Sequence, residues 1–217
     1  LDLKLNKSPY HIECFDNSNL MGTNPVGSCV VFKNAKPSKK DYRLYRIDDI
    51  SGPDDFASME QVVYRRLKRL VKEKNSLPDL IIVDGGKGQL SSGLKSLVKL
   101  GVEDKVAIIG IAKKLEEIFI PGDKLPLYIN KTSETLKLIQ QLRNEAHRFA
   151  INFHRKKRSK HAFESQIDNL SRVGPKTSEL LLNKFQSFKR IQRASEKDLI
   201  ELLGKVRGKS LFKQLKS

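Results

Sequence analysis

The feature that most constrains the fold is an apolar run that leads into an acid and then into a glycine-rich loop, DLIIVDGGKGQL at residues 79–90. The run is typical of a strand, and residues from about 88 to 100 have helical character. Burying an acid at the end of an apolar strand is costly unless a positive charge meets it. Two explanations of Asp84 are therefore open. It is either part of an ordinary turn, or the strand directs its carboxylate at a ligand.

A second strand with the same character is HIECFD at residues 11–16. The two-residue period of a strand puts Ile12, Cys14 and Asp16 on one face. If the two strands are neighbours, the carboxylates of Asp16 and Asp84 converge, and a divalent cation would relieve their repulsion. Oxygen ligands of this charge favour Mg²⁺ or Mn²⁺. Glycines at 85, 86 and 88 would let a phosphodiester backbone approach this metal.

A long helix is predicted over residues 133–160, with Ser133 as N-cap. His147 lies at the edge of its apolar face, so its imidazole can point toward the sheet. A single helical histidine is more often structural, and only the combination with Asp16 and Asp84 indicates a site. The same alternative holds for a lone acid at a strand end. The residues that mark the helix face are Leu136, Ile139, Arg143, Ala146, Ala150 and Phe153.

The remaining elements predict an α/β fold. Strands at 11–16, 26–32 and 42–47 form an antiparallel meander, and a helix follows within 52–74. Asp54 and Asp55 favour the N-terminus of that helix, and Asp55 is also a possible secondary acid of the site. A strand at 105–112 and a hairpin at 116–129 precede the long helix, so the order predicts a mixed sheet flanked by helices. The apolar stripe of the helix in 52–74 comprises Met59, Val62, Val63, Leu67, Leu70 and Val71.

A domain boundary is expected near residue 160, with the sheet domain at 1–160 and a small all-helical domain at 161–217. Two glycine-centred turns in the second domain, at VGPK (173–176) and VRGKS (206–210), are typical of paired helix-hairpin-helix modules. Glycines at such turns, Gly174 and Gly208, would expose backbone N–H groups to a phosphate, and Lys176 and Lys209 would add charge. The alternative is two ordinary corners of a small bundle.

Charge favours a polyanionic partner, because 42 Lys and Arg against 25 Asp and Glu give a net charge of +17. Nucleic acid and an acidic membrane surface both fit such an excess, while a solvated lysine-rich surface is the simpler explanation. Further candidate DNA contacts are Lys87 and the basic run at Arg155, Lys156, Lys157 and Arg158.

No apolar run reaches the roughly 20 residues that span a bilayer, so a soluble, cytoplasmic protein is expected. The start at Leu1 suggests a fragment of a longer chain. Cys14 and Cys29 lack metal-ligand spacing and are expected to be reduced and buried. The GGKG stretch lacks the spacing of a nucleotide-binding P-loop.

Several stretches together resemble a known family. They are IECFDNSNLMG, GPDDFASM, DLIIVDGGKGQL, LRNEAHRFAINFHRKKR and VGPK. Over nearly the whole chain they are similar to the C-terminal half of UvrC, the endonuclease subunit of bacterial nucleotide excision repair. This half combines a ribonuclease H-like nuclease fold with a tandem helix-hairpin-helix domain.

The resemblance implies that Asp16, Asp84 and His147 form the catalytic triad, with Asp55 matching a further acidic position. It implies a metal-dependent cut of the damaged DNA strand on the 5′ side of a lesion, with UvrB as protein partner and duplex or junction DNA held by the hairpins. The family's N-terminal nuclease domain, which makes the 3′ cut, has no counterpart here. The sequence also departs from the family at Asn17–Asn19, where Ile-Ser-His is usual, and at Arg207, where a proline-glycine turn is commoner.

Two other functions remain open from the sequence. One is a DNA-binding module that keeps the nuclease fold without catalysis, and the other is a nuclease of the same fold that selects junctions instead of lesions. Divalent-dependent cleavage of nicked, bubble and lesion-bearing duplexes would separate the three.

Overall fold

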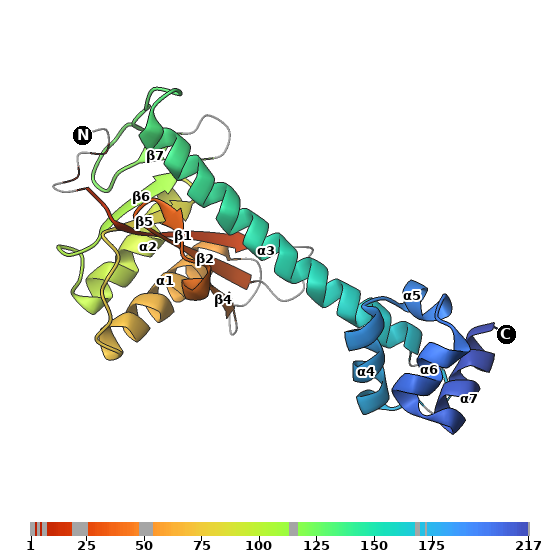
Figure 1. The fold of residues 1–217 in the computed structure, drawn as a ribbon. Helices are drawn as coiled ribbons and strands as arrows, with labels where there is room; N and C mark the ends of the chain where they lie inside the picture. The colour runs from red at the N-terminus through yellow and green to blue at the C-terminus, as the bar shows by residue number, and fades with distance from the viewer. Residues whose placement is uncertain are drawn as a thin grey trace. The chain divides into compact units, whose positions relative to one another are not determined.

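The computed structural model describes Leu3, Leu5 and residues 8–18, 26–47, 54–112, 117–167, 170–171 and 173–216, without the side chains of residues 156, 157, 159–161 and 164. The chain forms two compact units, Leu1–Asn152 and Phe153–Ser217, which we call the sheet unit and the helical unit. Helix α3 (Glu134–Ile167) begins in the sheet unit and ends in the helical unit (Figure 1).

The sheet unit is built on one mixed sheet of seven strands in the order β3-β2-β1-β5-β6-β7, with β4 also paired to β2. Strand β1 (His11–Ser18) lies between an antiparallel neighbour, β2 (Val26–Lys33), and a parallel one, β5 (Leu80–Asp84). The other strands are β3 (Lys36–Pro37), β4 (Arg43–Arg46), β6 (Ala107–Ile111) and β7 (Ile118–Phe119). The predicted meander of the first three long strands is confirmed, because β2 pairs antiparallel with both β1 and β4.

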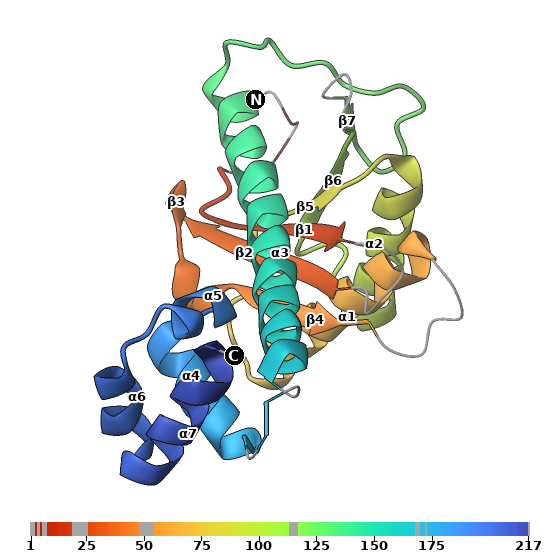
Figure 2. The same cartoon turned by 90° about the vertical axis from the view of Figure 1, so that its right-hand side faces the viewer.

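Helices cover both faces of this sheet. Helices α1 (Asp55–Lys72) and α2 (Lys87–Leu100) lie on one face, where Val62 of α1 packs so closely on Gly27 of β2 that a Cβ there would lie 2.4 Å from the valine methyl. Helix α3 crosses the other face (Figure 2), where the Ser28 hydroxyl donates to the carbonyl oxygen of Ala146 at 3.1 Å.

Burial on both faces explains why β5 is apolar up to its last residue, since each of its five residues is buried. The predicted stripe of α1 is buried from Met59 to Leu70, whereas Val71 is 46% exposed because it lies past the edge of the packed face. Asp54 caps α1 as predicted and accepts hydrogen bonds from the N–H groups of Phe56 and Ala57. Ser133 likewise accepts from the Leu136 N–H at the start of α3.

Among its described residues, the helical unit contains the end of α3 and four further helices, α4 (Pro175–Phe185), α5 (Phe188–Gln192), α6 (Glu196–Leu203) and α7 (Lys205–Lys216). Ser195 and Asp198 form a capping box at the start of α6. The unit has its own apolar core, made of Phe163, Ile167, Leu181, Ile191, Ala194, Leu199 and Leu211.

One prediction for this unit is wrong. The second turn lies at Gly204, which has a φ of 83° between α6 and α7, and not at residues 206–210. Gly208 lies inside α7, where its N–H donates to the Gly204 carbonyl and a Cβ would lie 2.6 Å from the backbone of Ile200. Its small size therefore serves the close packing of α7 on α6, and its N–H does not face a phosphate.

The long helix is also seven residues longer than predicted, since α3 continues to Ile167. Both cysteines are free and buried, as predicted. No helix in the described part of the chain combines the length and the low polarity that crossing a membrane requires.

Candidate active site

Two buried carboxylates meet at the carboxyl end of the central strands. In the register of the sheet, Cys14 lies beside Ile82, so Asp16 and Asp84 follow on the same face, two residues further along parallel neighbours. Asp16 is 2% exposed and Asp84 is 8% exposed. The convergence expected from the two sequence patterns is thus present.

The imidazole of His147 completes the group from α3. Its Nδ1 lies 3.1 Å from Asp16 Oδ2, and its side chain is 50% exposed. One ligand atom from each of Asp16, Asp84 and His147 can be chosen so that all three lie within 4.8 Å of one another. In the described residues this is the one group of at least three such side chains close enough to share a metal ion.

The position of His147 follows from how α3 is held on the sheet. The Ser28 hydroxyl, which donates to the carbonyl of Ala146, belongs to the residue of β2 that pairs with Asp16. Ala146 is fully buried, so the backbone of α3 approaches the sheet closely at this turn. The next residue, His147, is therefore directed at Asp16.

The pKa of Cys14 also reflects the proximity of the two carboxylates. Burial raises the pKa of the Cys14 thiol well above its usual range, and the negative charges of Asp84 and Asp16 raise it further. Arg143, one helical turn before His147, lowers this pKa and so brings positive charge to the same region. A signal in the sequence for Arg143 is its spacing of four residues from His147 on the same helix face.

Chemically, the group fits a divalent cation. Two carboxylates whose oxygens are largely withdrawn from water, together with an imidazole nitrogen, form a donor set of the kind that Mg²⁺ or Mn²⁺ takes. The half-exposed imidazole leaves the group open on one side, which a substrate would need.

Asp55 is not in this group. Its backbone oxygen accepts a hydrogen bond from Asn17 Nδ2 at 3.1 Å, which ties the end of β1 to the start of α1. Asp55 is the exposed first residue of α1. The structure therefore places it beside the segment that follows Asp16 and outside the converging trio.

The glycine loop differs in part from the expectation. A Cβ at Gly85 would lie 2.6 Å from Gln89 Oε1, and one at Gly88 would lie 2.2 Å from Phe56 Cε1. Side chains of the protein itself thus occupy the space next to two of the three glycines. Gly86 is open, with its nearest neighbour, a Phe119 carbon, at 3.9 Å.

Among the predicted DNA contacts that the structure describes, all except Gly208, which is buried in α7, are exposed. Lys87, Arg155, Arg158, Gly174, Lys176 and Lys209 lie at the surface, and the side chains of Lys156 and Lys157 lie outside the described part. Lys87 Nζ donates to the carbonyl of Lys124 and lies 5.9 Å from the centre of the Phe119 ring. Gly174 is the N-cap of α4 and has open space around its Cα.

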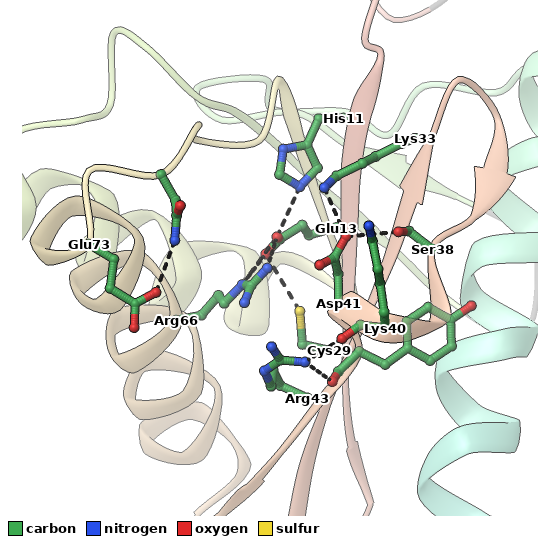
Figure 3. Close-up of polar contacts among 12 residues, drawn as sticks. His11, Glu13, Cys29, Lys33, Ser38, Lys40, Asp41, Arg43, Arg66 and Glu73 are labelled. Atoms are coloured by element: carbon green, nitrogen blue, oxygen red, sulfur yellow. Dashed lines mark hydrogen bonds and ion pairs between the residues drawn. The ribbon is translucent and has the colours of Figure 1, made fainter.

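A buried ion pair on the opposite face of β1 was not predicted. Glu13, which is fully buried, accepts hydrogen bonds from Arg66 of α1 at 2.9 Å and 2.5 Å and lies 3.1 Å from His11 Nε2 (Figure 3). Burial by itself would raise the pKa of Glu13, but the bonds to His11 and Arg66 lower it overall. The feature of the sequence that could have indicated this ion pair is Arg66, a charged residue among the apolar residues of α1, together with Glu13, an acid inside the apolar strand β1.

A mixed sheet with helices on both faces and two acids at the ends of neighbouring central strands defines the class of ribonuclease H-like domains. The family described as "UvrC RNAse H endonuclease domain" matches residues 2–151, and the chain belongs to this family.

Curated relatives named UvrABC system protein C match nearly the whole chain. That of Christiangramia forsetii is 64% identical over 203 residues, which are 94% of this chain and 34% of the relative. Those of Flavobacterium johnsoniae and Bacteroides thetaiotaomicron are 60% and 44% identical and cover 97% and 99% of this chain, against 35% and 36% of their own lengths. The chain thus spans about a third of the length of these relatives.

Among solved structures, a distant similarity is to endonuclease V of Ciona intestinalis in complex with an inosine-containing DNA. The TM-score is 0.38 at 19% sequence identity, over 65% of this chain and 59% of that chain.

Proposed function

We propose that this chain is the part of a nucleotide excision repair endonuclease that hydrolyses a phosphodiester bond on the 5′ side of a DNA lesion. The observation that carries the proposal is the convergence of Asp16, Asp84 and His147 within 4.8 Å at the edge of the sheet, in a member of the UvrC endonuclease family. The net charge of +17 suits a DNA substrate.

Asp16 and Asp84 would hold a divalent cation, Mg²⁺ or Mn²⁺. When bound, this cation would polarise the scissile phosphate and lower the pKa of a water molecule. The two carboxylates are held by the sheet, so their oxygens are fixed in place before substrate arrives. Exposed His147 is either a third ligand or the base that orients the attacking water.

The helical unit would hold duplex or junction DNA through the first turn, at Gly174 and Lys176. The start of α4 is a helix N-terminus on an open glycine, where backbone N–H groups can meet a phosphate. At the second turn, Lys205 and Lys209 of α7 would contribute charge, since the Gly208 N–H is already bonded.

The relatives' name, UvrABC system protein C, supports UvrB as the partner that presents the DNA, and cytoplasmic localisation follows from that role. A repair complex would supply the lesion in an opened duplex.

The test is a cleavage assay on a lesion-bearing duplex that carries a nick on the 3′ side of the lesion, with UvrB present, with and without Mn²⁺. Divalent-dependent incision on the 5′ side is expected. Salt-sensitive binding without cleavage in any metal would instead identify a DNA-binding module. Equal cleavage of undamaged bubble and nicked junctions would identify a structure-selective nuclease.

A further inference from the structure

An aromatic ring lies open beside the candidate site without a role in the trio. Phe56, in the first turn of α1, is 53% exposed. Its ring packs on the first turn of α2, where a Cβ on Gly88 would lie 2.2 Å from Cε1 and 2.7 Å from Cζ. The ring therefore packs against the backbone of Gly88, while about half of the side chain remains exposed.

Phe56 is held by the segments that follow the two carboxylates. Asn17, the residue after Asp16, bonds through its side chain to the carbonyl of Asp55, which directly precedes Phe56. Gly88, on which the ring rests, comes four residues after Asp84. The ring thus lies at the same end of the central strands as Asp16 and Asp84, on the side of the sheet that α1 and α2 cover.

Single exposed apolar side chains are common on proteins, so exposure alone means little. The other large exposed side chains in the described part of the sheet unit are Tyr10, Val71, Val98, Leu125 and Tyr128. Val71 and Val98 are close to the C-terminal ends of α1 and α2, and Tyr10, 66% exposed, precedes β1 at the end opposite Asp16. Leu125 and Tyr128 belong to the segment after β7. Phe56 differs from these five side chains because it is held by both segments that directly follow Asp16 and Asp84.

We infer that Phe56 is a stacking platform for a nucleobase of the cleaved strand, next to the scissile phosphodiester. This inference rests on the proposed function. A phosphate held at Asp16 and Asp84 would bring its neighbouring nucleotides to this end of the strands, where about half of the Phe56 side chain is exposed. Stacking of a base on an aromatic side chain contributes about 1–3 kcal/mol and tolerates any sequence, because every base has a π-face.

The platform has a consequence for substrate choice. Bases inside an intact duplex already stack on one another, so a base reaches Phe56 only after it has been unstacked, which costs a few kcal/mol and least where the duplex is distorted. The ring would therefore favour nicked, bubble or lesion-bearing DNA over intact duplex, without contacting the lesion itself.

The test combines photo-cross-linking with kinetics. 5-Iodouracil is placed at successive nucleotides on the 5′ side of the lesion, a range that includes the expected cut. Cross-linked peptides are identified by mass spectrometry in the Asp84→Asn background, which is expected to bind without cutting. A cross-link to Phe56 is expected, lost in Phe56→Ala and regained in Phe56→Tyr. Tyr10→Ala, which removes an aromatic side chain that is also more than half exposed, at the far end of β1, is the matched control.

In cleavage assays of bubble substrates, Phe56→Ala should raise KM by about 5- to 140-fold, as the stacking energy implies, and change kcat less. Phe56→Tyr should restore KM, and Tyr10→Ala should leave it unchanged. An unaltered melting temperature of Phe56→Ala shows that the loss is not one of folding.

The outcomes separate the two proposals. If the wild-type chain cuts but Phe56→Ala matches it in KM and no cross-link to Phe56 forms, the platform is refuted and the endonuclease stands. If no divalent-dependent cleavage is seen while the cross-link depends on Phe56, the platform stands and the endonuclease is refuted.

Discussion

The two faces of strand β1 carry buried carboxylates in opposite settings. On the α1 face, Glu13 is paired with the guanidinium of Arg66, so its charge is balanced by the protein itself. On the α3 face, Asp16 converges with a second carboxylate, Asp84, and with an imidazole that is charged only when protonated. The two acids lie three residues apart on one strand. The charge of Glu13 is neutralised by an arginine of the protein, whereas a divalent cation would neutralise the charge of Asp16 and Asp84.

This comparison teaches how to separate a structural acid from a candidate functional one. A buried ion pair contributes to a fixed fold only while both partners are present. A pair of like charges opposes folding, and its persistence in a well-packed site favours a role in binding.

The largest expected effect is on incision. Asp84→Asn removes a metal-binding oxygen charge and should lower the rate of 5′ incision by roughly 10³-fold or more, while DNA affinity stays close to that of the wild type. Gel-based cleavage and binding assays measure the two. Glu13→Gln, assayed well below its melting temperature, should cut within about threefold of the wild type, and a wild-type rate for Asp84→Asn would refute the site.

The next effect is on stability. Glu13→Gln leaves the Arg66 guanidinium buried without its counter-charge, and the free energy of unfolding should fall by about 3–5 kcal/mol. Thermal melting of the chain measures the change.

Replacing both partners, as Glu13→Leu with Arg66→Met, should cost less than Glu13→Gln alone, because no unpaired charge remains. A double variant at least as unstable as the single one would show that the pair is not the source of the effect.

The third effect is the response to metal. Mn²⁺ at about 100 times its dissociation constant should stabilise the wild-type chain by about 2.7 kcal/mol, seen as a higher melting temperature. Asp16→Asn should lose this response, yet melt at or above the wild-type temperature without metal, because one of two like charges is gone. Glu13→Gln should keep the response, and an undiminished response of Asp16→Asn would place the metal elsewhere.

The smallest effect is on the pH dependence of stability. The pKa of Glu13 is lowered in the folded state from the ordinary value of 4.5, so its pairing stabilises the protein fully above that value. The stabilisation is lost as the pH falls from there through the lowered pKa, with a slope of at most about 1.4 kcal/mol per pH unit from one group. The melting temperature of Glu13→Gln should therefore change less with pH in this acid range than that of the wild type. The same pH dependence in both proteins would contradict the assignment.

Much of the sheet unit could be predicted from short patterns. The two strands that end in Asp16 and Asp84 carry their signal in consecutive residues, and α1 and the start of α3 carry theirs in spacing and in caps such as Asp54. The site followed from one further assumption, that the two strands are neighbours, and β1 and β5 are indeed parallel and adjacent.

The errors arose where a pattern has two physical explanations. A small residue permits either an open backbone or close packing, and sequence alone does not choose between them. Gly88 makes room for the ring of Phe56, and Gly208 makes room for the backbone of Ile200. The second turn of the helical unit was placed four residues too late for this reason.

The sequence by itself determined the apolar strands, the acids at their ends and the excess of positive charge, because these depend on neighbouring residues and on composition. Only the tertiary structure decided that Arg66 meets Glu13, that Ser28 holds α3 so that His147 reaches Asp16, and that Phe56 is exposed near the ends of the central strands. These three contacts join residues 53, 118 and 131 positions apart, and the packing of helices on a sheet, which no local pattern encodes, brings them together.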